Sequence, residues 1–574
     1  MDALPRHWIP PITGSTIKPI RHTRPSLLLC LLVPLFSIAA PPPHVDRPGD
    51  SKNELPAYQP EPTDPGLILP PIRKDPQQDR LSRGIQVYVK KITITGNTVL
   101  SNEELEKLTA PYVNRNIHTS ELQTLRQALT LHYINKGYIN SGVVIPDQQV
   151  SDGVIELQVI EGTLNEIHIT GNRRLKPEYI RNRLMLGAEP PLNINDLQQT
   201  ILILQQNPLI KKIHTELKPG SLPGQSVLET RIEEAKAYSI RLGVNNHRPP
   251  SIGAERGEIE VTHRNITGHG DKLNIRYGST KGLDDFGVQY DFPVNAHDTT
   301  IGLFYDKGDS SVTEEPFDSL EIESESETVG IRVSHPFYRT PNREFRMGLS
   351  LEHRESKTFL LGLPFSFSTG AVDGKSAVSV LRFSQEWTDR SQQRVIAVRS
   401  TFNVGLDAFD ASVNHDQEDG KFTSWLGQFQ WAQRIGAQGK QIIFRADTQL
   451  ANDPLLPLEQ FSVGGMSTVR GYRENQLVRD NGFVASVEYR MPVFNTWLGK
   501  NKLQLAAFLD FGRSWNRERA TATPEDISSA GIGLRWAPTN NIYGDIYWGK
   551  RLRTVTNPDN DLQDDGIHFQ FQIT

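Results

Sequence analysis

Short stretches of alternating hydrophobic and polar residues fill the chain from about residue 236 to its end. In residues 503–512, one set of alternate positions includes Leu505 and Leu509, and the other includes Gln504 and Asp510. Successive side chains of a β-strand point to opposite faces, so this alternation predicts strands with one apolar and one polar face. Sixteen such strands are expected, beginning near Ala237, Glu255, Asp271, Asp284, Thr299, Ser324, Arg343, Ser376, Gln393, Lys421, Lys440, Gly482, Leu503, Ser528, Asn541 and Gly566.

The gaps between these strands are alternately short and long. Short gaps such as 267–270 and 295–298 follow even-numbered strands, and long segments such as 357–375 and 453–481 follow odd-numbered strands. Bacterial outer-membrane barrels have short periplasmic turns and longer extracellular loops. The pattern predicts a sixteen-stranded antiparallel transmembrane β-barrel over residues 236–574. The strands of a soluble β-sandwich or barrel also have alternating hydrophobic and polar residues. Such a fold explains neither the regular alternation of short and long gaps nor the signal sequence described next.

Composition and the first residues agree with an exported membrane protein. Hydrophobic residues make up 37% of the 574 residues and the mean hydropathy is -0.45, which excludes a bundle of membrane helices. A barrel is compatible, because only half of each strand must be apolar. The one long apolar run, residues 27–38, follows Arg21 and Arg24 and leads to two alanines. This arrangement is typical of a secretory signal, which we expect over residues 1–40.

The segment after the signal is a linker by composition. Residues 41–84 are rich in proline, starting with the triplet Pro41–Pro43, and dense prolines disfavour regular structure. The single cysteine, Cys30, lies inside the predicted signal, so the mature chain would have no thiol for a disulfide or a metal site. The net charge of -5 identifies no partner, and nothing indicates nucleic-acid binding.

A repeat precedes the barrel. Residues 92–97 read Ile-Thr-Ile-Thr-Gly-Asn, and residues 167–172 read Ile-His-Ile-Thr-Gly-Asn. Each copy continues with two helical stretches and two strands, and a capping box at Ser101 and Glu104 predicts the first helix. Unrelated α+β domains would not share both the six-residue segment and the element order. We therefore expect two tandem α+β modules of β-α-α-β-β order, the first over residues 85–162 and the second over residues 163–235.

Several short motifs stand out in the first module and in the barrel. They are Gly137-Tyr138, Val143–Pro146, Gln148, Gly153 and Val159–Gly162 in the first module, and Gln460–Gly465, Val469–Tyr472 and Phe508–Gly512 in the barrel. With these motifs, the chain resembles the outer-membrane transporters of two-partner secretion, relatives of the haemolysin and filamentous-haemagglutinin exporters in the outer-membrane assembly superfamily. The modules resemble the polypeptide-transport-associated repeats of that family, and the resemblance covers about residues 85–574.

The resemblance implies a contact known as the lumen latch. Residues 453–481 are long enough to fold into the barrel, and the alternation directs Asp510 toward the same space. A guanidinium–carboxylate pair shielded from water gains from bidentate geometry while desolvation offsets much of its attraction, so the pair would position the loop more than stabilise the barrel. On the alternative interpretation, Arg470 lies on a solvated loop. The expected latch residues are Arg470, Gly471, Tyr472 and Asp510, supported by Gly464, Gly465, Phe508 and Gly512.

The function that the resemblance implies is a translocase of the bacterial outer membrane, with its modules in the periplasm. It would capture an unfolded exoprotein that carries an N-terminal secretion domain, by strand addition to a module edge, and export it through the barrel. Outer-membrane lipid and the barrel-assembly machinery are the other implied partners, and a monomer without cofactor or metal ion is expected. In the family an N-terminal helix plugs the pore, whereas residues 41–84 offer a linker but no convincing helix.

Two other functions stay open from the sequence. One is an assembly factor that inserts other barrels, although such factors usually carry more modules, and the other is a passive solute pore or receptor, which needs no capture modules. No enzymatic activity is predicted: Gly374-Lys375-Ser376 ends like a phosphate loop, but Thr369 replaces the required glycine. The acidic segments 314–327 and 407–419 fit no standard calcium loop and are expected to be solvated.

Overall fold

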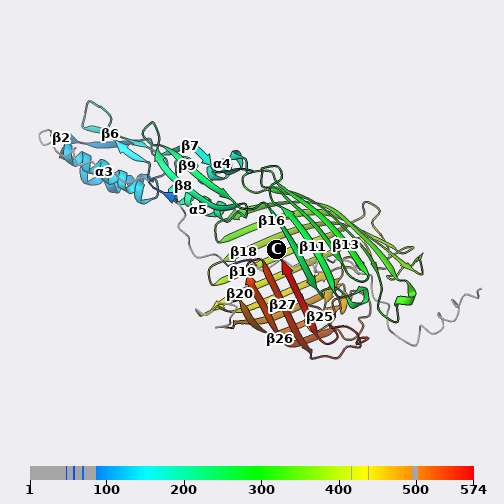
Figure 1. The fold of residues 1–574 in the computed structure, drawn as a ribbon. Coiled ribbons are helices and arrows are strands. Elements are labelled where there is room, and N and C mark those ends of the chain that lie inside the picture. Colours follow the sequence, from blue (N-terminus) through cyan, green and yellow to red (C-terminus); the bar gives the residue numbers. More distant parts are fainter. Residues whose placement is uncertain are drawn as a thin grey trace, which may run out of the picture. The chain divides into compact units, whose positions relative to one another are not determined.

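The computed structural model describes residues 47, 56–58, 67–69, 86–150, 152–414, 417–436, 439–493 and 502–574. The expected signal peptide lies outside these residues, as does most of the expected linker with any plug helix. In the described part, two small α+β modules precede a closed antiparallel barrel (Figure 1). The predicted fold class is confirmed.

The first module is a three-stranded sheet with two helices. Its sheet order is β3-β6-β5, with β3 parallel and β5 antiparallel to the central β6. Leu125, Leu129 and Tyr133 lie on one face of α3 and pack with Leu105 of α2 in the core. The elements are β3 (Lys91–Thr95), α2 (Asn102–Thr109), α3 (Thr119–Asn135), β5 (Gly142–Val144) and β6 (Val154–Ile160).

The sequence prediction for this module was incomplete. A two-stranded ribbon of β2 (Gln86–Val89) and β4 (Arg115–His118) adds to the expected order, and β4 lies between the two helices. Each strand has only four residues, which is too short for an alternation to be recognised. Val89 and Ile117 of the ribbon are buried together with Ile155 in a second, smaller cluster.

The predicted capping box of α2 is present. Ser101 accepts a hydrogen bond from the backbone of Glu104, and the Glu104 carboxylate accepts one from the backbone of Ser101. Lys136, just after α3, also donates to this carboxylate. The hydrogen bond from Lys136, followed by that from Ser101, lowers the pKa of Glu104 to about 2.

The second module repeats this plan around a larger apolar core. Its sheet order is β1-β8-β9-β7, and Leu197, Ile201 and Leu204 of α5 are buried against it. On β7, His168 lies between Glu229 and Glu166, and hydrogen bonds to both, the one with Glu229 first, raise the pKa of His168. The elements are β7 (Thr163–Thr170), α4 (Pro177–Met185), α5 (Ile194–Gln205), β8 (Ile210–Pro219), β9 (Gln225–Glu234) and the two-residue strand β1 (Leu67–Ile68).

The glycine of the repeated six-residue segment is required for the same structural reason in both modules. Gly96 and Gly171 end β3 and β7 with φ values of 76° and 84°. A Cβ atom would lie 2.4 Å from the carbonyl oxygen of Val159 at the first position and 2.2 Å from that of Ile232 at the second. Only glycine allows both the positive φ and this close approach.

The barrel contains sixteen strands that pair in sequence order, and β10 pairs with β28 to close it. Every strand begins within two residues of its predicted start. A two-residue strand, β17 (Leu363–Pro364), only extends the end of β16. The strands are β10 (Tyr238–Asn245), β11 (Arg256–His263), β12 (Lys272–Ser279), β13 (Leu283–Pro293), β14 (Thr300–Ser311), β15 (Glu323–Arg339), β16 (Arg343–Leu360), β18 (Lys375–Arg390), β19 (Arg394–Leu406), β20 (Thr423–Ile435), β21 (Lys440–Ala451), β24 (Asn481–Pro492), β25 (Leu503–Trp515), β26 (Asp526–Thr539), β27 (Ile542–Arg551) and β28 (Ile567–Ile573).

The two faces of the barrel wall differ as the alternation predicts. On β25, Leu505 and Leu509 are 45% and 62% exposed, while Phe508 and Asp510 are buried. An apolar outer face and a polar inner face are what a lipid-embedded barrel requires. No described helix is long and apolar enough to cross a membrane.

One part of the wall is taller than predicted. β15, β16 and β18 have 17, 18 and 16 residues, whereas a transmembrane strand needs roughly 9–11. β16 continues to Leu360, inside the segment 357–375 that was predicted as loop. The residues of β16 pair with β15 on one side and with β18 on the other, and this pairing extends the strands beyond their apolar stretches.

Candidate functional site

The candidate site is built on residues 453–481, which follow β21 and end at the first residue of β24, and which we call the lumen loop. Its short strands β22 (Phe461–Val463) and β23 (Leu477–Arg479) pair as a hairpin. Val463, Val469 and Tyr472 are fully buried in an apolar cluster that also contains wall residues of β20, β24 and β26. The loop therefore packs against the inner face of the barrel and does not extend into solvent.

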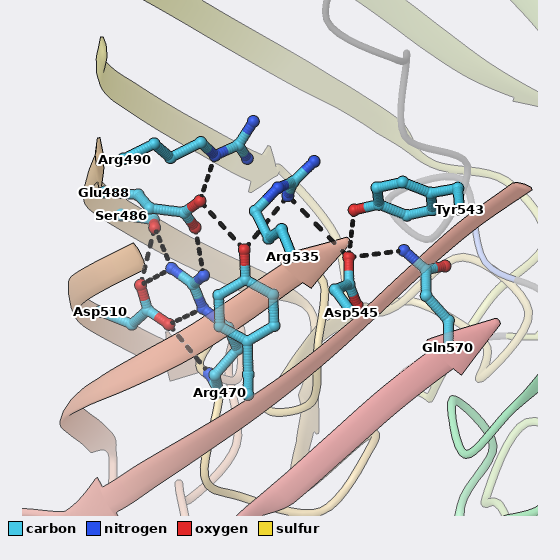
Figure 2. A network of polar contacts seen from close by, with 10 residues as sticks. Arg470, Ser486, Glu488, Arg490, Asp510, Arg535, Tyr543, Asp545 and Gln570 are labelled. Carbon is cyan, nitrogen blue, oxygen red and sulfur yellow. Dashed lines mark hydrogen bonds and ion pairs between the residues drawn. The ribbon is translucent and has the colours of Figure 1, made fainter. Parts of the chain in front are cut away.

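Arg470 of the lumen loop contacts Asp510 of β25 directly. The guanidinium donates two hydrogen bonds, from Nε to Oδ2 at 2.8 Å and from Nη2 to Oδ1 at 2.9 Å, and the backbone N–H of Arg470 donates a third to Oδ2 at 3.0 Å. Figure 2 shows this bidentate pair. Arg470 and Asp510 are 5% and 3% exposed, so the pair is shielded from bulk water. Arg470 and Asp510, which the sequence predicted to lie close together, are in direct contact.

The contact belongs to a larger set of residues, which we call the Arg470 network. Glu488 of β24 pairs with Nη1 of Arg470 and, on its other oxygen, with Arg490. Ser486 accepts from Nη2 of Arg470 at 3.0 Å and donates to Asp510 at 2.6 Å, as Figure 2 shows. Sequence reasoning missed Glu488, although Glu488 lies on the polar face of an alternating strand, next to Ser486 and Arg490.

Aromatic rings complete the surroundings of the guanidinium. The Cζ atom of Arg470 lies 3.8 Å from the ring centroid of Phe508 and 4.9 Å from that of Tyr547. Such stacking favours the cation electrostatically, and it requires the planar guanidinium of arginine. Phe508, expected only as a supporting residue, therefore contacts the central side chain.

Gly471 is held where no other residue fits. Its φ is 89°, and a Cβ atom would lie 2.6 Å from the carbonyl oxygen of Gly549 on β27. Its backbone N–H donates to Nε2 of His568 on β28 at 3.1 Å. The loop backbone therefore lies directly against the barrel wall at this residue.

Tyr472 fixes the next position of the loop. Its hydroxyl lies 2.9 Å from the carbonyl oxygen of Ser528 and 2.8 Å from that of Arg553, and it accepts a hydrogen bond from the backbone N–H of Arg553 at 3.1 Å. All three latch residues of the loop are thus bound to the wall or to the loop that follows β27.

The supporting glycines make room for the same packing. A Cβ atom at Gly512 of β25 would lie 2.3 Å from Cγ1 of Val463, and one at Gly464 would lie 2.5 Å from the carbonyl oxygen of Arg473. Gly465 has a φ of 99° and faces the carboxylate of Glu474. The glycines expected from the motifs therefore allow close approach within the loop and between loop and wall.

Some of the acidic residues expected to be solvated have partners instead. Glu314 pairs with Arg473 at 2.9 Å, and Arg473 also donates from Nε to Asp564 at 2.7 Å. Glu418, in the other acidic segment, pairs with Arg519. The expectation of free, solvated acids is wrong for Glu314 and Glu418, because arginines of neighbouring loops fold onto them.

Two features that bear on an enzymatic role, a metal-binding cluster and a phosphate loop, can be compared with the described residues. No group of three or more His, Cys, Asp or Glu side chains that could hold a metal ion occurs among them. Lys375 and Ser376 begin strand β18, so the phosphate-loop fragment does not lie between a strand and a helix.

Comparison with known proteins shows that the chain is similar to outer-membrane transporters. Residues 224–536, more than half of the chain, match the family described as haemolysin secretion/activation protein ShlB/FhaC/HecB, and residues 87–162 match the POTRA domain of ShlB type. The chain is 21% identical over 551 residues to the heme/hemopexin transporter protein HuxB of Haemophilus influenzae, covering 90% of this chain and 93% of HuxB.

Two further similarities concern CdiB. The chain is 25% identical over 425 residues to the outer membrane transporter CdiB of Escherichia coli, covering 72% of this chain and 70% of CdiB. A solved structure of CdiB from Escherichia coli superposes with a TM-score of 0.64 at 22% identity, covering 88% of this chain and 92% of that one. The structural similarity supports the same fold for both chains.

Proposed function

The chain belongs to the haemolysin secretion/activation protein family (ShlB/FhaC/HecB) and is an outer-membrane transporter that exports an exoprotein through its barrel, and we propose that it serves one or a few large exoproteins in two-partner secretion. Its barrel lies in the outer membrane, and the modules lie in the periplasm. The exoprotein would be recognised by an N-terminal secretion domain, and the transporter would act as a monomer inserted by the barrel-assembly machinery. Relatives named for heme/hemopexin transport and haemolysin transport indicate the classes of exoprotein to test first.

The observation that carries the mechanism is the Arg470 network inside the barrel. A loop held by a buried, bidentate ion pair has one preferred position, because the pair is favourable only in a narrow geometry. We infer that Arg470, Gly471, Tyr472 and Asp510 form the lumen latch, which holds the lumen loop against the wall between rounds of export. Gly464, Gly465, Phe508 and Gly512 would support it by allowing the close packing described above.

Capture by strand addition has a precedent within the chain itself. Leu67 and Ile68 form β1, a two-residue strand that pairs in parallel with β8 at Thr215 and Glu216 and covers the edge of β8 there. The edge of β8 therefore accepts an extended segment through backbone hydrogen bonds, as strand addition requires. We propose that an extended segment of the exoprotein takes this place, and that its folding outside the cell then gives export its direction.

Deletion of the gene tests the function. Loss of the transporter should leave one exoprotein, or a few, in the periplasm, while the other outer-membrane barrels stay at their normal abundance. A general decrease in outer-membrane barrels would support an assembly factor instead. Normal secretion together with reduced uptake of a solute would support a passive pore or receptor.

A cross-linking experiment tests the capture site. A photo-cross-linking amino acid at Glu216, an exposed residue of β8, should trap the exoprotein in the periplasm when the exoprotein takes the place of β1. The same amino acid at Glu178, exposed in the first turn of α4, serves as the matched control. Equal trapping at both positions would contradict capture at the β8 edge.

A further inference from the structure

The lumen loop is bound to the barrel at a second place, apart from the Arg470 network. Glu459, near the amino-terminal end of the loop, is 1% exposed. Its carboxylate accepts hydrogen bonds from Arg354 of β16 (Nη1 to Oε1, 2.9 Å) and from Arg382 of β18 (Nη2 to Oε1, 2.8 Å; Nη1 to Oε2, 3.0 Å). Two guanidinium groups of the wall thus enclose both oxygens of one loop carboxylate.

These three residues form part of a charge-balanced group, which we call the Glu459 cluster. Arg382 donates from Nε to Glu352 of β16 at 2.9 Å, so two arginines face two glutamates. Arg354 also donates to the backbone carbonyl of Leu458 at 2.8 Å, which ties the loop backbone to the same side chain. Breaking a buried pair by removing one partner is strongly unfavourable, because the remaining charge is left without compensation.

Apolar packing beside the cluster holds the same end of the loop. Leu455, Leu456 and Leu458 are buried against Val378 and Val380 of β18. On the closed barrel, β19, β20, β21 and β24 separate β18 from β25, which carries Asp510. The loop is therefore bound to two different parts of the wall, once before β22 and once after it.

The Glu459 cluster borders a cavity in the barrel interior. A cavity of about 720 Å³ is lined by Arg354, Arg382 and Glu352, together with other inward-facing residues of β12 to β20. Arg47, from the segment before the modules, lines the same cavity and donates to the carbonyl oxygen of Pro457 in the lumen loop at 3.1 Å. Movement of Glu459 away from the wall would join the space now filled by the loop to this cavity.

We propose that Glu459, held by Arg354 and Arg382, is a positioning residue that keeps the lumen loop across the pore in the resting transporter and must separate from them before an exoprotein passes. The proposal deepens the proposed function and depends on the loop being the element that narrows the pore. The second attachment of the lumen loop thus lies on β16 and β18, two strands that contain none of the sequence motifs.

Single-channel conductance in planar lipid bilayers tests this proposal without any exoprotein. The purified full-length Glu459→Gln protein should conduct several-fold more than the wild type, or spend a much larger fraction of time open. Loss of a buried pair shifts such an equilibrium by roughly a hundredfold or more. Glu323→Gln, the same change at an exposed residue of β15, is the matched control and should leave the conductance unchanged. Conductance of the Glu459→Gln protein equal to that of the control would overturn the proposal.

A charge exchange separates pairing from a general loss of folding. The double variant Glu459→Arg with Arg354→Glu keeps the cluster neutral, so its conductance should return toward that of the wild type and lie below that of Glu459→Arg alone. The heat-dependent shift of the barrel in gel electrophoresis checks that each protein is folded. A rise in conductance that the exchange does not reduce would contradict the pairing. Secretion of the exoprotein, measured separately, tests the transporter function, so failure of one inference is distinguishable from failure of the other.

Discussion

Replacement of Arg470 by alanine is expected to release the lumen loop while the barrel stays folded. The side chain binds Asp510 with two hydrogen bonds and also pairs with Glu488, and all three residues are buried. Removal of one partner of a buried ion pair costs about 3–5 kcal/mol. Glu488 keeps its pair with Arg490, but Asp510 loses its cationic partner and regains water only if the loop moves away, so the cost affects loop position and not the strand pairing of the wall. It corresponds to a change of roughly a hundredfold to several thousandfold in the ratio of bound to released loop.

Hydrogen–deuterium exchange of the loop amides measures this release. Amides of residues 461–479 should exchange much faster in the Arg470→Ala protein, while those of the barrel strands stay protected. Arg513→Ala on β25 is the matched control, because the pair of Arg513 with Glu525 is exposed at 57% and 38% and such pairs contribute about 0–1 kcal/mol. If the loop amides of both variants exchange equally fast, the Arg470 network does not hold the loop and the reasoning is wrong.

Three further predictions concern single positions. Gly471→Ala places a Cβ atom 2.6 Å from the carbonyl of Gly549, so it should destabilise the bound loop by about 1 kcal/mol or more, seen as faster exchange of the loop amides, whereas unchanged exchange would contradict the close contact. Ser101→Ala removes the N-cap of α2 and should lower the unfolding free energy of a fragment of residues 85–235, measured in urea, by about 1 kcal/mol. An unchanged unfolding free energy would show that the hydrogen bond between Ser101 and Glu104 does not stabilise the helix. Because its glutamates raise the pKa of His168, protonated His168 stabilises the second module fully below its ordinary pKa of about 6.5, and this contribution is lost as the pH rises through the raised value. The melting temperature of the His168→Gln fragment should therefore lie furthest below that of the wild type at acidic pH, and a difference that grows with pH would refute the assignment.

The barrel was the more predictable part of the molecule because its physics is local. Alternation such as that of Leu505 and Asp510 follows from the two faces of a strand, so each strand start could be placed from its own residues. The sequence did not predict the ribbon of β2 and β4 or the length of β15, β16 and β18. Both depend on backbone pairing with a neighbouring strand, which the residues of a single strand do not reveal.

The candidate site divides in the same way. Motif resemblance predicted a meeting of Arg470 and Asp510, and the structure brings the two together. Glu488 was missed because its role depends on the register between β24 and β25, which no short segment contains. Glu459 was missed because its partners Arg354 and Arg382 lie 105 and 77 positions away along the chain.

The tall wall of β15, β16 and β18 has a consequence for the cell surface. At roughly 3.3 Å per residue and a tilt of about 40°, the 18 residues of β16 rise about 45 Å along the barrel axis, against a hydrocarbon thickness of about 30 Å. The excess lies on the side of the long loops, so about 15 Å of hydrogen-bonded sheet stands among the lipopolysaccharide sugars. An antibody or a bacteriophage would find there a rigid, ordered epitope, and an external protease would find few cleavable peptide bonds.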